Sequence, residues 1–217
     1  MDIKAIVFDF DGVIVESVGI KDQAFQILFR DYPQHIDEIM SYHRTHNATI
    51  RFEKFRYITE KILKTEYAEG KEEELKEKFS RFVFEKICAC PLVKGAQEFL
   101  DYFYRKTPMF LASVNPAEEL DKILDVRGLT KYFKKVYPYP RMKKEAIEEI
   151  LRQEKISSRQ TVFIGDSYED YEAAQATGIL FVGRERHRTF EAIDVPSFKD
   201  LKEIRKFLLV GLSRASV

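Results

Sequence analysis

The chain has 217 residues, of which 45% are hydrophobic and 33% are charged, so it has the size and composition of a globular protein with room for one domain and an insert. Its 36 lysines and arginines balance its 36 aspartates and glutamates, which argues against a global nucleic-acid-binding surface. The N-terminus lacks the pattern of a signal peptide, and no apolar run reaches membrane-spanning length. We therefore expect a cytoplasmic protein without nucleic-acid or membrane partners.

Short apolar runs alternate with helical patterns through most of the chain. Buried strands are predicted where β-branched or aromatic residues are bounded by polar residues or glycine, at 5–8, 109–112, near Val136, at 162–164 and at 179–182. Amphipathic helices are predicted where apolar residues recur every three or four positions, at 93–103, 120–124 and 146–151. Because parallel strands need crossover connections, this alternation predicts a doubly wound, Rossmann-like α/β fold with helices on both faces of a parallel sheet.

One long segment near the N-terminus breaks this alternation. Between residues 17 and 90 the pattern predicts no strand, only helices at 24–29, 52–63 and 75–87. We therefore expect an α/β core domain formed by residues 1–16 and 91–217, and a helical domain formed by residues 17–90. Because the insert follows the first strand, we expect it above the carboxyl end of the sheet, where open α/β folds bind ligands.

Two carboxylates follow the first predicted strand. Asp9 and Asp11 end this strand, and Gly12 lets the backbone turn sharply away. Two neighbouring carboxylates repel each other unless a divalent cation or a division of roles relieves the repulsion. A helix cap or turn that happens to contain two aspartates explains this segment equally well.

A second acidic segment follows the strand predicted at 162–164. Asp166 and Asp170 are four residues apart, so at the start of a helix they would share one face, and Asp166 could alternatively serve only as its cap. In a parallel sheet this segment lies near Asp9 and Asp11. Together the acids form a cluster of hard oxygen ligands, the type that Mg²⁺ prefers.

Two further positions suit a phosphate group. Ser113 and Val114 follow the strand predicted at 109–112, and Asn115 and Pro116 come next as predicted N-cap and first helical residue. The Ser113 hydroxyl and the backbone N–H groups beside a helix N-terminus can bind a phosphate oxygen, although a capping hydroxyl is the alternative interpretation.

A pair of lysines opens the helix predicted at 145–152. Lys143 and Lys144 lie at its N-terminus, whereas cations are more stable at a helix C-terminus. This placement suggests that a lysine neutralises phosphate and the acidic cluster. Solvated surface lysines are the alternative interpretation.

As a set, these segments resemble the four motifs of the haloacid dehalogenase (HAD) superfamily, in order and in strand context. The matching residues are Asp9-Phe10-Asp11-Gly12, Ser113, Lys143 and Gly165-Asp166-Ser167-Tyr168-Glu169-Asp170. The resemblance covers about residues 1–16 and 91–210. The helical insert resembles the mobile cap of the phosphoglycolate phosphatase and β-phosphoglucomutase branch of this superfamily.

The resemblance implies a Mg²⁺-dependent phosphatase that acts on a small phosphorylated molecule through an aspartyl-phosphate. Asp9 would be the nucleophile, and Asp11 would protonate the leaving oxygen and later deprotonate water. The other implied roles are Mg²⁺ binding by the Asp9 carboxylate, the Asp11 backbone carbonyl and Asp166, phosphate binding by Ser113, Val114 and Lys143, and support from Gly12, Asn115 and Asp170.

Several alternatives stay open. Asp11 argues against a dehalogenase, because the resembling carbon–halogen enzymes lack the second aspartate. A phosphosugar mutase would use the same residues, and a non-catalytic binding module would have little need of the full set. Lys143 lacks the proline that often follows it in the family, so Lys144 is the alternative phosphate ligand. The sequence does not distinguish a monomer from a homodimer.

The helical insert contains candidate substrate ligands. Arg51 and Lys54 lie near the start of the helix predicted at 52–63, after what the sequence indicates to be a loop containing His43, His46 and Asn47. A guanidinium or ammonium group there could hold a carboxylate or second phosphate of the substrate. Basic residues on the surface of an amphipathic helix are the alternative interpretation.

Overall fold

The computed structural model describes residues 2–46, 49–186 and 188–213, with the side chains of residues 212 and 213 excepted. The chain divides into two compact units, one formed by Met1–Glu16 and Cys90–Val217 and the other by Ser17–Ala89. We call these the core unit and the helical unit.

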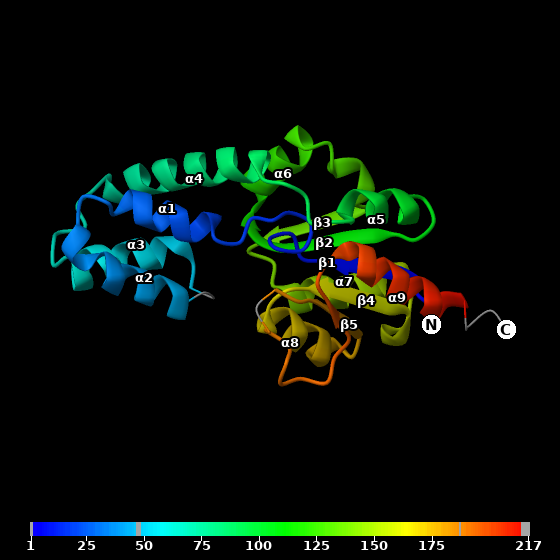
Figure 1. Cartoon of the computed structure of the whole chain (residues 1–217). Helices are drawn as coiled ribbons and strands as arrows, with labels where there is room; N and C mark the ends of the chain where they lie inside the picture. Colours follow the sequence, from blue (N-terminus) through cyan, green and yellow to red (C-terminus); the bar gives the residue numbers. More distant parts are fainter. Residues whose placement is uncertain (1, 47–48, 187, 214–217) are drawn as a thin grey trace. The chain divides into compact units, whose positions relative to one another are not determined.

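A six-stranded parallel sheet forms the centre of the core unit (Figure 1). Its order is β3-β2-β1-β4-β5-β6, and the strands are β1 (Ala5–Phe8), β2 (Met109–Pro116), β3 (Lys135–Tyr139), β4 (Thr161–Gly165), β5 (Leu180–Arg184) and β6 (Ser197–Phe198). The predicted α/β fold class is confirmed. Only β6 was not predicted, because two residues are too few for an apolar pattern to be read.

Helices cover both faces of this sheet. They are α5 (Ala96–Phe103), α6 (Ala117–Val126), α7 (Lys143–Glu154), α8 (Tyr168–Thr177) and α9 (Leu201–Ser213), with short 3₁₀ turns at Thr130–Tyr132 and Ser158–Gln160. Successive strand residues point to opposite faces. Ala5 and Val7 of β1 therefore pack in one cluster with Ile147 of α7 and Ala174 of α8. Phe8 faces the other way and meets Phe99 of α5 edge-to-face, with ring centroids 5.4 Å apart.

The register of the sheet brings distant segments together at one edge. Phe8, the last residue of β1, pairs with Leu111 of β2 and with Ile164 of β4. Residues that follow these three positions therefore lie side by side at the carboxyl end of the sheet. In this strand order the chain runs outward from β1 in both directions, and open α/β sheets bind ligands where the order reverses.

The helical unit is built from α1 (Ile20–Leu28), a 3₁₀ turn at Pro33–His35, α2 (Ile36–Thr45), α3 (Arg51–Tyr57), a π-helical turn at Ile58–Ile62 and α4 (Lys71–Ala89). Its core contains Phe25, Phe55 and Phe79, with ring centroids 5.4 to 5.7 Å apart. The helix predicted at 52–63 is thus an α-helix that ends in a π-helical turn. Helix α2 was not predicted, and His43 lies within it rather than in a loop; Asn47 lies outside the described residues.

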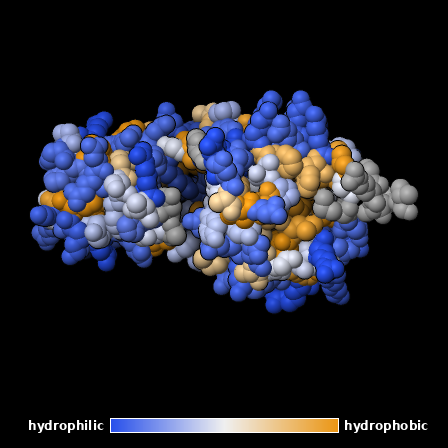
Figure 2. Space-filling model, turned by 60° about the horizontal axis from the view of Figure 1, so that its bottom comes forward, coloured by the Kyte–Doolittle hydropathy of each residue, from blue (hydrophilic) through white to orange (hydrophobic). Residues whose placement is uncertain are grey.

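Polar and charged side chains dominate the visible surface, and smaller groups of hydrophobic side chains are scattered among them (Figure 2). Among the helices of the described residues, none combines the length and the apolar character needed to cross a membrane.

Candidate active site

Asp9 lies directly after β1, at the carboxyl end of the sheet. Its backbone N–H donates to the Ile164 carbonyl at 3.0 Å, which extends the β1–β4 pairing to this residue. The side chain is buried, with 6% of the residue exposed. Gly12, three residues later, has a φ of 75°, a left-handed conformation that favours glycine and turns the chain away from the site.

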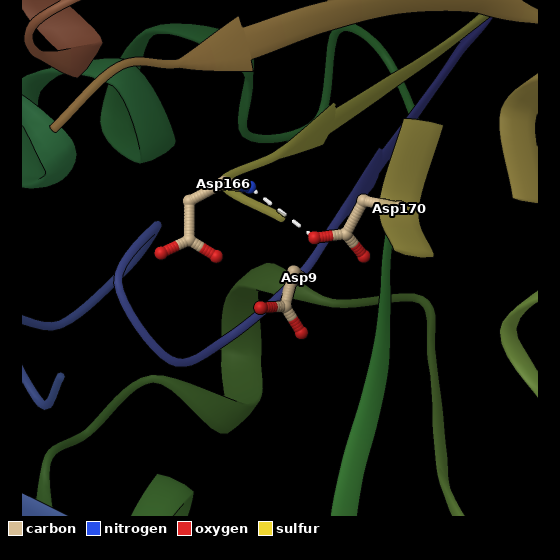
Figure 3. A group of neighbouring side chains, drawn as sticks. All are labelled: Asp9, Asp166 and Asp170. Atoms are coloured by element: carbon tan, nitrogen blue, oxygen red, sulfur yellow. Dashed lines mark hydrogen bonds between the residues drawn. The ribbon is translucent and has the colours of Figure 1, made fainter. Parts of the chain in front are cut away.

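Three carboxylates gather at this edge of the sheet (Figure 3). Asp9, Asp166 and Asp170 each offer an oxygen atom, and these oxygens lie within 4.8 Å of one another. The predicted metal ligands Asp9 and Asp166 are thus brought together. Asp170, predicted as a supporting residue, completes this group, whereas the Asp11 carboxylate is not part of it; the prediction assigned Asp11 its backbone carbonyl.

Asp170 is fully buried and bonded on both oxygens. Its Oδ2 accepts hydrogen bonds from the backbone N–H groups of Asp166 and Ser167, each at 3.2 Å, and from the Ser167 hydroxyl at 2.7 Å. Its Oδ1 accepts from Lys143 Nζ at 2.5 Å. This carboxylate therefore orients the loop and the lysine. The cap of α8 is Ser167, so the alternative in which Asp166 caps this helix was wrong.

Lys143 is the first residue of α7, and its ammonium group reaches into the acidic group. Its Nζ lies 3.0 Å from Asp9 Oδ1 as well as 2.5 Å from Asp170 Oδ1. Lys144 points elsewhere, with its Nζ 3.7 Å from Glu148 on a largely exposed helix face. The structure thus places Lys143, and not Lys144, at the site.

Burial and like charges change the protonation of these groups. Burial is the main cause that raises the pKa of Asp9 to about 8; Lys143 opposes this rise, and Asp170, Asp166 and Asp11 add to it. Burial, followed by Asp170, raises the pKa of Asp166 to about 6. Desolvation lowers the pKa of Lys143, but Asp170 and Asp9 outweigh it and raise the pKa overall. Burial thus favours the uncharged form of Asp9 and Asp166, whereas Lys143 keeps its charge.

The prediction that Asn115 is the N-cap of a helix is wrong. Strand β2 continues through Pro116, which occupies the N-cap position of α6. The Asn115 side-chain amide instead donates to Asp11 Oδ2 at 2.9 Å, an interaction between residues 104 positions apart. The buried Ser113 hydroxyl accepts from the Asn115 backbone N–H at 3.2 Å, while the Val114 side chain is exposed. Asn115 thus fixes the Asp11 carboxylate, which sequence spacing could not show.

Two basic residues near the end of β5 were not predicted. Arg184 is buried; its Nη2 donates to Glu16 at 2.6 Å and its Nε to the Lys199 carbonyl at 3.2 Å. Arg186 lies close to the acidic group, with its Nε 3.6 Å from Asp166 Oδ2. The sequence offered one signal for them: both arginines closely follow the apolar strand predicted at 179–182, and the ends of other predicted strands already carried candidate site residues.

Of the two candidate ligands in the helical unit, Lys54 is buried and Arg51 is half-buried. Lys54 is 4% exposed, and its Nζ contacts His43 at the ring Nδ1 (3.2 Å) and at the carbonyl oxygen (3.1 Å). The Arg51 guanidinium lies over the rings of Phe52 and Phe79, 5.4 and 5.2 Å from the ring centroids. Binding of substrate by Arg51 or Lys54 stays a prediction.

A comparison with protein families identifies the family of this chain. The family model for haloacid dehalogenase-like hydrolases matches residues 6–183. The chain belongs to this family. The predicted HAD superfamily membership is confirmed, and so is the prediction of an enzyme, at the level of a hydrolase.

Known relatives cover most of this chain. A phosphoglycolate phosphatase of Photobacterium profundum is 28% identical over 193 residues, which are 83% of this chain and 82% of that protein. A predicted phosphoglycolate phosphatase from Haemophilus somnus has a similar structure, with a TM-score of 0.77 at 18% identity over 96% of this chain and 99% of that one. A HAD-hydrolase from Bacillus subtilis, solved bound to magnesium, has a TM-score of 0.74 at 20% identity over 96% and 99%.

Proposed function

We propose that this HAD hydrolase is a Mg²⁺-dependent phosphatase that hydrolyses small phosphomonoesters through an aspartyl-phosphate at Asp9. The observation that carries this proposal is the position of Asp9, buried at the carboxyl end of β1, 3.0 Å from the ammonium group of Lys143 and grouped with Asp166 and Asp170. The similarity to phosphoglycolate phosphatases supports it.

The residues of the site fit a magnesium ion. Mg²⁺ prefers carboxylate and carbonyl oxygens, which are the donors that Asp9, Asp166 and the Asp11 backbone present. Four acids with Lys143 and Arg186 leave this region with a net negative charge. Burial is the main cause of the raised pKa values of Asp9 and Asp166, and the neighbouring acids add to it. Bound here, Mg²⁺ would supply positive charge to the phosphoryl oxygens and keep Asp9 ionised.

The chain's own groups account for both chemical steps. A carboxylate oxygen of Asp9 attacks phosphorus while the bond to the ester oxygen breaks, and Asp11 donates a proton to that leaving oxygen. Asp11 then removes a proton from water, whose oxygen attacks the aspartyl-phosphate and releases Asp9 and inorganic phosphate. Asn115 holds the Asp11 carboxylate through its 2.9 Å hydrogen bond, and Lys143 stabilises negative charge on the phosphoryl group.

We also propose that the helical unit acts as the cap that selects the substrate. It is a separate compact unit inserted between β1 and α5. The inserted unit begins at Ser17, shortly after Asp9. Phosphoglycolate is the substrate that the name of the Photobacterium profundum relative suggests. Sugar phosphates are the class that the resemblance to the β-phosphoglucomutase branch implies.

Phosphate release from a panel of phosphorylated metabolites, with and without Mg²⁺, tests this proposal. We expect turnover that requires Mg²⁺ and that falls below detection in an Asp9→Asn variant. Equal activity of that variant and the wild type would contradict the mechanism. Isomerisation of a sugar phosphate without net release of phosphate would indicate a mutase, in which a sugar hydroxyl replaces water as the acceptor.

A further inference from the structure

A second cation lies against the acidic site. Arg186 follows the end of β5 by two residues, and its Nε lies 3.6 Å from Asp166 Oδ2. Because β5 pairs in parallel with β4, the ends of the two strands lie side by side, and a residue after one meets a residue after the other. The Arg186 side chain is 17% exposed, so most of it is withdrawn from water next to Asp166.

Hydrogen bonds between backbone N–H groups and the Glu185 side chain hold the segment around Arg186. The Glu185 carboxylate accepts hydrogen bonds from the backbone N–H groups of Arg186 (3.0 Å), Thr189 (2.7 Å) and Phe190 (3.0 Å). Phe190 is 2% exposed and packs so closely on Gly183 that a side chain there would collide with its ring. These contacts set the backbone position of Arg186 independently of its contact with Asp166.

The ion pairs of the site are divided unevenly. Lys143 forms ion pairs with Asp9 and Asp170, whereas Asp166 pairs with Arg186. Within the described part of the chain, Arg186 supplies the single ion pair of the Asp166 carboxylate. At 3.6 Å this contact is too long for a hydrogen bond. Asp166 can therefore turn to another cation without breaking a hydrogen bond to Arg186.

We propose that Arg186 is a built-in counter-cation for Asp166 that competes with Mg²⁺ for this carboxylate. The inference rests on the proposed function, because it requires Asp166 to be a metal ligand. In the metal-free protein Arg186 reduces the repulsion between Asp166 and the other acids. In the metal-bound protein the same positive charge repels the divalent ion, so it weakens metal binding and makes it reversible.

Mg²⁺ titration by isothermal calorimetry tests this role without any substrate. We expect Arg186→Gln to bind Mg²⁺ about tenfold more tightly than the wild type, since removal of a unit charge beside a divalent ion has about this effect even with the screening of bulk water. Arg186→Lys keeps the charge and should stay within about threefold of the wild type. The difference should shrink at high ionic strength.

A matched control lies in the same loop. Arg188 has an 82% exposed side chain and pairs with Glu191 at 3.7 Å, so Arg188→Gln removes the same charge away from the site. We expect its Mg²⁺ affinity to equal that of the wild type. If both glutamine variants bind Mg²⁺ more tightly to the same extent, the effect comes from the net charge of the protein, and the proposal is overturned.

Thermal unfolding separates this role from a purely structural one. With EDTA, Arg186→Gln should melt below the wild type, because Asp166 loses its counter-charge, and saturating Mg²⁺ should remove that difference. An equal loss of Tm with and without Mg²⁺, or an unchanged or weakened Mg²⁺ affinity, would overturn the proposal. If Asp166→Asn binds Mg²⁺ as well as the wild type does, the metal is not at this site, and the proposed function fails together with the inference.

Discussion

The two units of this protein bury charged groups in opposite ways. In the core unit, Asp9 and Asp166 lie among further acids, and burial raises the pKa of Asp9 to about 8 and that of Asp166 to about 6. In the helical unit, His43 lies between Asp22 and Lys54, and burial lowers the pKa of His43 to about 4 and that of Lys54 to about 8.

Burial favours the uncharged form in both units, which raises the pKa of a carboxyl group and lowers that of an imidazole or ammonium group. The two clusters differ in their partners. His43 Nε2 lies 3.0 Å from Asp22 Oδ1, its Nδ1 lies 3.2 Å from Lys54 Nζ, and its ring stacks on Phe25 with centroids 4.0 Å apart. Arg44 donates to the other Asp22 oxygen at 2.8 Å. Each of these groups is matched within its own unit. The core cluster holds an excess of negative charge instead, which is the property of a site that receives a cation and an electrophile.

The largest expected effect is the loss of the lysine in the core cluster. Lys143→Met should lower kcat/KM about a thousandfold, because it removes the ammonium group that contacts Asp9 and would stabilise the phosphoryl group. Lys144→Met is the matched control, with a side chain that is 55% exposed and directed to Glu148. It should stay within about twofold of the wild type in the same phosphate-release assay. Equal losses in the two variants would contradict the assignment.

A methyl group at Gly165 should disturb the same cluster from beneath. A side chain at this position would collide with the Asp170 carboxyl group, and Asp170 positions Lys143. We expect Gly165→Ala to lower kcat/KM about a hundredfold, together with an overpacking cost of about 1–3 kcal/mol. In Gly70→Ala a side chain meets open space at a φ of 84°, so backbone strain should lower stability while activity is kept. Full activity of Gly165→Ala would show that the Asp170 position is not required.

In the helical unit the matched cluster should contribute stability. His43→Ala removes the ring that stacks on Phe25 and leaves Lys54 and Asp22 without their shared partner, which we expect to cost about 3 kcal/mol of unfolding free energy. Chemical denaturation measures this. His46→Ala is the control: His46 is exposed and contacts Tyr42 and Thr45 in its own helical turn. A loss below about 0.5 kcal/mol in both variants would contradict a structural role for the cluster.

The last expected effect is an opposite response of the two units to pH. Raised carboxyl pKa values mean that the folded core binds more protons than the unfolded chain, so without metal its stability falls as pH rises from about 4 through about 8. The lowered pKa of His43 means that stability of the helical unit is present above pH 6.5 and is lost as pH falls toward about 4. Hydrogen exchange of each unit at pH 5 and pH 8 in EDTA measures both trends.

Magnesium should change one of these trends and not the other. We expect Mg²⁺ to restore protection of the core unit at pH 8, where Asp166 is ionised and Asp9 is partly ionised, and to leave the helical unit unchanged. If both units respond to pH and to Mg²⁺ in the same direction, the proposed difference between the acidic core cluster and the matched cluster of the helical unit is wrong.

Local patterns were enough to predict the strands and the acids that follow them. The runs ending at Phe8 and Ile164 are apolar on both faces, which only buried parallel strands require, so the positions of Asp9 and Asp166 followed from strand ends meeting at one edge. The predicted start of a helix near Lys143 was also correct, because its apolar positions recur at helical spacing.

The tertiary structure alone decided which side chains meet. Lys143 and Lys144 are adjacent in sequence, but successive residues of a helix point in directions about 100° apart, so one reaches Asp9 and the other reaches solvent. Asn115 has the sequence features of a helix cap and instead bonds to Asp11, because strand β2 continues past it. Arg186 meets Asp166 because β5 lies next to β4, and that adjacency depends on the order of strands and not on their sequences.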